Sequence, residues 1–182
     1  KMSALFEKII RFNSDDKDAL MFLGLAYYHR GDFEQSHKYY QRAIHAMSPE
    51  EASYVNHIGH IVPREDKELY LTRAGSPTQS SAYATQFWHK RDPLLSSEYN
   101  ERQLEHYNRM AYANLRFGIP RQNIMGWETE RGMIYIRYGK PSQWVRTQPD
   151  EKMLGGTEIW YYPKFSFRFE DHYSSGKFLL DN

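Results

Sequence analysis

Apolar positions change their spacing along the chain, and this change divides the sequence into two parts. From residue 19 to residue 44 they recur every three or four positions, which places them on one face of a helix. Beyond Gly126 they alternate with polar residues in short runs, which is typical of strands with one buried face. The pattern predicts helices in the first part and an antiparallel sheet in the second.

Residues 19–44 are predicted to form two helices that meet at a turn of Gly31 and Asp32. Gly24 and Ala43 are small, so they allow the two helices to cross closely. A similar apolar pattern in residues 3–16 predicts another helix before this pair. The first part of the chain is therefore expected to be a series of packed helices.

The helical pattern repeats with a period of 34 residues. Phe6 lies 34 residues before Tyr40, and Ile9 lies 34 residues before Ala43. This period, with its small and aromatic positions, resembles the tetratricopeptide repeat. Residues 3–16 then correspond to the second helix of an earlier repeat, so we expect the natural protein to extend further in the N-terminal direction.

In such repeats, one face of the first helix lines a groove that can hold a partner. The predicted partner-binding residues on this face are Asp18, Met21, Leu25, Tyr28 and His29. Repeats that clamp a terminal carboxylate place Lys, Asn or Arg there, whereas this chain places mostly apolar groups. We therefore expect an apolar helix or extended segment in the groove, from a partner or from preceding repeats. Leu25→Asp is then expected to weaken the assembly and to leave the isolated fold intact.

Residues 57–60 read HIGH and residues 1–3 read KMS, which resemble the two ATP-binding signatures of class I aminoacyl-tRNA synthetases. In those enzymes HIGH follows a strand and opens a helix, where it meets the phosphates of ATP. Here a capping-box pattern at 48–51 starts a helix, and apolar residues every three positions extend it to Ile61. HIGH would then lie late in a helix, so we interpret both signatures as chance.

The two histidines of this stretch, His57 and His60, would share one face of the expected helix. Two imidazoles without a clear third ligand do not define a zinc site. The other histidines have no recognisable ligand spacing. We therefore predict no metal site and no cofactor.

Four short segments in the second part are predicted to be strands, and in one of them, 165–170, Phe alternates with polar residues. They are residues 133–138, 158–162, 165–170 and 177–180. Short turns between successive strands indicate an antiparallel meander. The preceding segment 100–117 has helical spacing and is expected to cover the apolar face of the sheet.

The predicted fold class is therefore α+β, with helical hairpins of the tetratricopeptide type followed by a helix-covered antiparallel β-meander. The turn-rich residues 75–81, GSPTQSS, are a plausible boundary. They divide the chain into a helical repeat region at 1–74 and an α+β domain at 75–182.

Residues 126–141 read GWETERGMIYIRYGKP, which resembles the motif that names the bacterial GWxTD domain. Residues 87–93, 105–118 and 158–162 resemble other blocks of that family, in the expected order. Glu130 departs from the pattern, because the family name has Asp at this position. The family often occurs with helical repeats in exported or envelope proteins of Gram-negative bacteria. The resemblance therefore implies the bacterial periplasm or cell envelope, but it implies no reaction.

The chemistry of the motif predicts a structural joint. Gly126 lets the chain turn, and Trp127 is a large anchor that we expect to be buried between the long helix and the sheet. Thr129 and Glu130 can accept hydrogen bonds from free backbone N–H groups. Arg131 carries a planar guanidinium that is suited to a carboxylate.

Several charged residues are expected to form one cluster beneath the sheet, with Arg131 paired to a carboxylate at 92, 101 or 105. The cluster comprises Arg91, Asp92, Glu101, Glu105, Arg109 and Arg131. An alternative is a catalytic carboxylate pair, made by Asp92 with Glu101 or Glu130. We favour the structural network, because a cluster of paired charges perturbs pKa values just as an active site does and is the more common arrangement.

Composition narrows the classes of function. The chain has 24 Lys and Arg against 23 Asp and Glu, which argues against nucleic-acid binding driven by net charge. The longest apolar run, at 19–28, is too short to cross a bilayer, so membrane association would need an N-terminal extension or a partner.

We therefore predict a non-catalytic scaffold or protein-interaction subunit of a bacterial cell-envelope assembly, with protein partners in a larger complex. The alternative is a domain that binds or processes glycans. An open cleft lined by Trp160, Tyr162 and converging carboxylates would favour that alternative.

Overall fold

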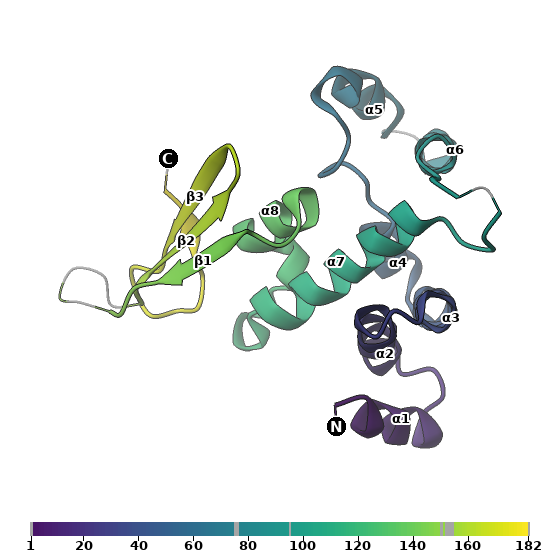
Figure 1. The fold of residues 1–182 in the computed structure, drawn as a ribbon, viewed down its shortest axis with the longest axis horizontal. Coiled ribbons are helices and arrows are strands. Elements are labelled where there is room, and N and C mark those ends of the chain that lie inside the picture. The colour runs from purple at the N-terminus through teal and green to yellow at the C-terminus, as the bar shows by residue number, and fades with distance from the viewer. Residues whose placement is uncertain (1, 75–76, 95, 150, 152–154, 182) are drawn as a thin grey trace. The chain divides into compact units, whose positions relative to one another are not determined.

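The computed structural model describes residues 2–74, 77–94, 96–149, 151 and 155–181 (Figure 1). The chain forms two compact units, Lys1–Ala111 and Tyr112–Asn182, and the division between them falls within helix α7 (Glu101–Phe117). Helices come first and a four-stranded antiparallel sheet follows, so the predicted α+β class is confirmed. The boundary expected near residue 75 does not coincide with this division and stays a prediction.

The first unit consists of helices. In chain order they are α1 (Met2–Phe12), α2 (Lys17–His29), α3 (Phe33–Ala46), α4 (Pro49–Val55), η1 (Arg64–Asp66), α5 (Lys67–Ala74), α6 (Pro77–His89) and the first part of α7. Asp16 caps α2 by accepting a hydrogen bond from the Ala19 N–H at 2.8 Å. Asp32 caps α3 by accepting from the Gln35 N–H at 3.2 Å. These caps fix where each helix begins.

Helices α2 and α3 form the predicted hairpin and pack closely. A Cβ on Gly24 would lie 2.6 Å from the ring of Tyr40, so the close crossing needs glycine here. Tyr40 is fully buried, and the hydroxyl of Ser36 donates a 2.8 Å hydrogen bond to the Gly24 carbonyl. Gly31 turns the chain between the helices with a φ of 79°. The helical hairpin predicted from the spacing is therefore confirmed.

The helix predicted across residues 57–60 is wrong, because α4 ends at Val55. Its start was predicted correctly, since Ser48 and Glu51 make the capping box. After the helix ends, Ile58 and Val62 enter a cluster with the buried rings of α5 and α6. The chain leaves the helical path because burial of these two residues outweighs continuation of a short helix.

The second unit combines the end of α7 with short helices and the sheet. Its elements are η2 (Pro120–Gln122), η3 (Gly126–Glu128), α8 (Glu130–Tyr138), β1 (Gln143–Arg146), β2 (Thr157–Tyr162), β3 (Phe165–Glu170) and β4 (Leu179–Leu180). The strands pair in the order β1-β2-β3-β4, and each pair is antiparallel. Trp160 of β2 is fully buried, with ring centroids of Phe117, Trp144 and Phe169 between 4.8 and 5.3 Å away.

Residues 133–138 form most of helix α8, so the strand predicted there is wrong. Thr129 caps this helix, and Gly139 ends it with a φ of 76°. The buried residues of the helix, Arg131, Gly132, Tyr135 and Ile136, follow helical spacing. The predicted strands at 158–162 and 165–170 are confirmed, and the fourth is reduced to Leu179–Leu180. Strand β1 was not predicted.

Candidate functional site

The apolar residues of the predicted groove lie inside the first unit. Met21 is 5% exposed and Leu25 is 7% exposed, whereas Asp18 and His29 are on the surface. Tyr28 is half-buried, and burial raises the pKa of its hydroxyl, with a further increase from Glu105 of α7. Met21 and Leu25 are therefore part of the packed core, so the structure leads us to expect that Leu25→Asp destabilises the fold.

The first part of α7 packs on this helical region through aromatic and polar side chains. The rings of Tyr40 and Tyr107 are 5.9 Å apart, and the Tyr107 hydroxyl donates a 2.9 Å hydrogen bond to Asn56 Oδ1. Nε2 of His106 lies 3.1 Å from the Val55 carbonyl oxygen and donates to it. The first part of α7 therefore packs against α3 and the end of α4, and the apolar segment expected in the groove stays a prediction.

The GWETER motif at 126–131 begins with a close approach of two backbones. A Cβ on Gly126 would lie 1.9 Å from the Ala113 carbonyl oxygen of α7, and the Gly126 N–H donates to Asn114 Oδ1 at 2.9 Å. A Cβ on Gly132 would lie 1.8 Å from the Gly126 carbonyl oxygen. Only glycine fits at these two positions, because backbone atoms cannot move aside as a side chain can.

Thr129 and Glu130 connect the motif to backbone on either side. The Thr129 hydroxyl donates to the Gly126 carbonyl at 2.7 Å and accepts from the Gly132 N–H at 3.1 Å, which caps α8. Oε2 of Glu130 accepts a hydrogen bond from the Leu180 N–H of β4. The carboxylate at this position therefore joins the start of α8 to the last strand.

Arg131 lies in an aromatic and charged environment within the second unit. Its Nη1 is 3.2 Å from Oε1 of Glu158, and its Nη2 donates to the Gly176 carbonyl at 3.1 Å. The guanidinium also lies 4.1 Å from the ring centroid of Phe178 and 5.3 Å from that of Phe117. Burial lowers the pKa of Arg131, and the charge of Glu158 opposes that effect.

The partner of Arg131 is therefore Glu158, rather than one of the predicted carboxylates Asp92, Glu101 and Glu105. Glu158 lies on β2 and its side chain is 1% exposed. A second cation, Arg146 of β1, has its Nε 3.8 Å from the same carboxylate oxygen. Oε2 of Glu158 and Nε of Arg131 have no hydrogen-bond partner among the described residues.

Trp127 is only half-buried, so its expected burial is not what the structure shows. The fully buried tryptophan is Trp160, which the sequence analysis placed in a possible ligand cleft. The motif is anchored instead by Gly126, by the cap at Thr129 and by Arg131, together with the adjacent Gly132.

Comparison with known protein families agrees with this geometry. A family model described as the GWxTD domain matches residues 64–179, and a tetratricopeptide repeat model matches residues 17–47. This chain belongs to the GWxTD domain family. Searches of curated proteins and of solved structures found no match. The GWxTD match begins within the first unit and extends almost to the end of the chain, so the family domain includes α5, α6 and α7 as well as the sheet.

The remaining charged residues of the expected cluster make local contacts within the first unit of the GWxTD protein. Arg109 pairs with Glu105 one helical turn before it on α7. The Ser97 hydroxyl donates to Glu101 at 2.7 Å, and the Leu94 N–H donates to Asp92 at 3.2 Å. Asp92 and Glu101 therefore act at the turn before α7 and at its start, where carboxylates satisfy free donors.

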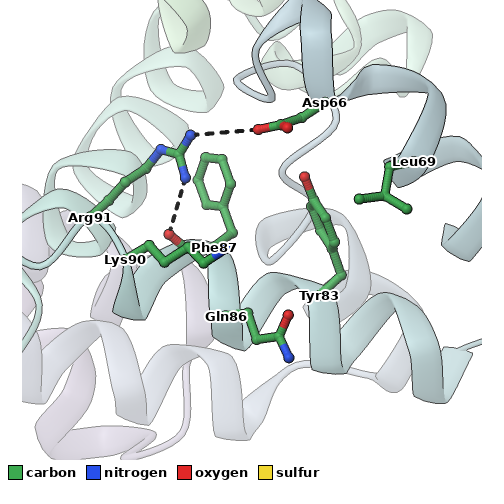
Figure 2. Close-up of a pocket in the computed structure, with 7 residues that line it drawn as sticks. All are labelled: Asp66, Leu69, Tyr83, Gln86, Phe87, Lys90 and Arg91. Carbon is green, nitrogen blue, oxygen red and sulfur yellow. Dashed lines mark hydrogen bonds and ion pairs between the residues drawn. The ribbon is translucent and has the colours of Figure 1, made fainter.

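Arg91, the last residue of the expected charged cluster, lines a cavity of about 200 Å³ in the first unit (Figure 2). The lining residues, from η1, α5, α6 and the turn after α6, are Asp66, Leu69, Tyr83, Gln86, Phe87, Lys90 and Arg91. The guanidinium of Arg91 lies 3.9 Å from the Phe87 ring centroid and also 3.9 Å from the Asp66 carboxylate. The lining thus combines one carboxylate and two cations with the apolar side chains of Leu69 and Phe87.

Asp171 is a structural carboxylate that the sequence analysis missed. It is 2% exposed and accepts hydrogen bonds from the Ser175 N–H at 3.0 Å and the Gly176 N–H at 2.7 Å. Burial raises the pKa of its carboxyl, but these bonds outweigh that effect and hold the pKa below its usual value. The sequence DHYSSG at 171–176 carried the signal, because Asp followed by Ser and Gly often forms such a turn.

Among the residues that the structure describes, no helix is both long and apolar enough to cross a membrane. No group of three or more His, Asp or Glu side chains in this described part of the chain could hold a metal ion.

Proposed function

We propose that this GWxTD protein is a non-catalytic scaffold subunit of a bacterial cell-envelope assembly. The tetratricopeptide repeat at 17–47 indicates protein–protein interaction. The frequent occurrence of GWxTD domains with helical repeats in envelope proteins supports a place in the periplasm or on the envelope. Membrane association would come from a preceding segment or from a partner.

The single observation that carries a non-catalytic role is how the motif uses its polar groups. Thr129, Glu130 and Arg131 bond to backbone groups or to a buried carboxylate. A catalytic carboxylate must reach a substrate, whereas Glu158 is 1% exposed. The motif therefore supports the fold, and it leaves the surfaces of the domain for partners.

The glycan alternative has less support, because one of the two rings expected to line its cleft, Trp160, is not accessible. A sugar ring stacks on an exposed aromatic face, but Trp160 is fully buried under other rings. A retaining or inverting glycosidase needs two carboxylates that reach the substrate. The candidates here already accept hydrogen bonds: Asp92 from the Leu94 N–H, Glu101 from the Ser97 hydroxyl, and Glu130 from the Leu180 N–H of β4.

A test begins with the natural host, in which the protein carries a C-terminal affinity tag at its own locus. Cells are treated with a crosslinker that does not cross the inner membrane, and the tagged protein is then purified under denaturing conditions. We expect crosslinked species that contain a defined partner in stoichiometric amount, recovered with the envelope fraction.

In the matched control, envelopes of the same strain are first solubilised in detergent and diluted, and the crosslinker is added afterwards. Dilution removes chance encounters between proteins, so only stable complexes are still crosslinked. Recovery of the protein in the cytosolic fraction, or as an uncrosslinked monomer in the envelope fraction, would contradict the proposal.

A further inference from the structure

Four aromatic rings form a connected surface in the second unit, at the end of α8 and on the β2–β3 hairpin. This aromatic patch comprises Tyr138, Tyr162, Phe165 and Phe167. The ring centroid of Tyr138 lies 5.0 Å from that of Phe165 and 5.4 Å from that of Phe167. The ring of Tyr162 lies 5.2 Å from that of Phe165. Tyr138 is 40% exposed and Phe165 is 44% exposed, so the patch is open to solvent.

The patch is an uncovered continuation of the core. Phe165, Phe167 and Phe169 alternate along β3 and so point to one face of the sheet. Phe169 is fully buried, Phe167 is half-buried and Phe165 is exposed. Helix α8 ends at Tyr138, so this end of the apolar face extends beyond its covering helix.

The rings of the patch are held in place before any partner arrives. The Tyr162 hydroxyl donates a 2.8 Å hydrogen bond to the Gly139 carbonyl, which ties β2 to the end of α8. Each ring also packs on at least two others of the patch. Rigid aromatic groups lose little conformational entropy on binding, and they dominate the energy of many protein interfaces.

Charge identifies the kind of partner. The segments 131–149 and 159–169, which supply all four rings, contain no Asp or Glu. They contain the surface cations Arg137, Lys140 and Lys164, and the Arg137 guanidinium lies 5.6 Å from the Tyr138 ring. A second copy of this chain docked patch to patch would oppose cation to cation. An acidic partner complements the same surface.

We propose that the aromatic patch binds an acidic segment of a partner protein that also carries aromatic or large aliphatic side chains. This inference rests on the proposed function, because it names the kind of protein that the scaffold holds. The apolar side chains of the segment cover Phe165 and Tyr138, and its carboxylates pair with Lys140 and Lys164.

The test selects binders from a displayed library of random 16-residue peptides, with the full chain as the target. We expect the selected peptides to be enriched in Asp and Glu together with Trp, Phe or Leu. Their affinity, measured by fluorescence anisotropy, should fall at least tenfold for the double variant Tyr138→Ser and Phe165→Ser. Tyr173→Ser removes an aromatic ring that is 83% exposed after β3, and it should leave the affinity unchanged.

A charge variant tests the same surface without removing a ring. Lys164→Glu should weaken the selected peptides by a similar factor, whereas the exposed Lys177→Glu should not. Peptides without acidic enrichment, or peptides that bind the double variant as well as the parent, would overturn the inference. Sedimentation of the parent with phosphatidylglycerol vesicles, lost in the double variant, would assign the patch to an anionic membrane and would also overturn it.

Crosslinking in the host separates this inference from the proposed function. If the parent gives no partner, the proposed function fails and the inference fails with it. If the double variant gives the same crosslinked partner in the same yield as the parent, only the aromatic patch is refuted. Loss of that partner in the double variant, together with competition by a selected peptide, supports both.

Discussion

Arg131 and Glu158 illustrate what the sequence determines about a single residue. The planar guanidinium in the motif predicted a carboxylate partner, and a carboxylate is there at 3.2 Å. The identity of that partner could not be predicted, because Glu158 lies 27 residues away and reaches Arg131 only through the register of β2. The predicted candidates have other partners. Asp92 and Glu101 accept hydrogen bonds from the Leu94 N–H and the Ser97 hydroxyl, and Glu105 pairs with Arg109.

His106 gives a prediction about pH. Burial lowers the pKa of its imidazole from 6.5 to about 4, although the bond to the Val55 carbonyl opposes this effect. The unfolded chain therefore binds a proton between pH 6.5 and 4 that the folded chain does not bind. The free energy of unfolding should fall as the pH falls through this range, by about 3 kcal/mol from this group alone.

The measurement compares urea unfolding of the parent and of His106→Gln at pH 7 and pH 4. The glutamine keeps an N–H donor for Val55 but does not titrate, so its loss of stability over this range should be smaller by about 3 kcal/mol. His89→Gln, at an exposed position of α6, should behave like the parent. Equal pH dependence in all three proteins would refute the role of His106.

At the scale of elements, caps and glycines decided where helices begin and end. Residues 133–138 are mostly apolar and include two isoleucines and two tyrosines, so they resemble a strand when taken alone. The helical period becomes visible only when the segment is taken to begin at residue 129. Thr129 then caps the helix, and the buried residues 131 and 132 lie one turn before the buried residues 135 and 136. The hairpin of α2 and α3 was predicted correctly because its period, its turn and its small residues all agree.

Gly126→Ala tests the contact between the motif and α7. The new methyl group would lie 1.9 Å from a backbone oxygen that cannot rotate away, so we expect a loss of at least about 3 kcal/mol in unfolding free energy. Gly31→Ala is the matched control, because its Cβ meets nothing within 4 Å and its positive φ alone costs about 1–2 kcal/mol. Similar midpoints of urea unfolding for these two variants would refute the close approach.

Leu25→Asp tests the packing of the repeat helix. Leu25 is 7% exposed, so a carboxylate there is either buried or forces the helix away from its neighbours. We expect a loss of more than about 3 kcal/mol, measured by far-ultraviolet circular dichroism in urea. Gln41→Asp, on an exposed position of α3, should change stability by less than about 0.5 kcal/mol. If Leu25→Asp unfolds like the parent, the groove is open to a partner after all.

At the scale of the whole molecule, the fold class and both families were predictable from sequence. The repeat period identified the tetratricopeptide helices, and the ordered blocks identified the GWxTD domain. The two compact units were not predictable, because their division falls inside the continuous helix α7. The aromatic patch was not predictable either. Phe165, Phe167 and Phe169 occupy equivalent alternate positions of β3 in the sequence, and Phe165 is exposed only because α8 ends before it can cover this ring.

The central claim is that the GWETER motif builds the fold and is not a surface site. The most direct test is the urea unfolding of Arg131→Ala, followed by tryptophan fluorescence, because Trp127, Trp144 and Trp160 report on the second unit. Removing this guanidinium leaves the buried charge of Glu158 with only the exposed Arg146 nearby, so we predict a loss of about 3 kcal/mol. Arg168→Ala removes two ion pairs, with Glu170 and Asp181, whose arginine is 51% exposed, and it should cost less than about 1 kcal/mol. An Arg131→Ala protein that unfolds like the parent but no longer crosslinks to its partner would contradict the claim and assign the motif to a functional surface.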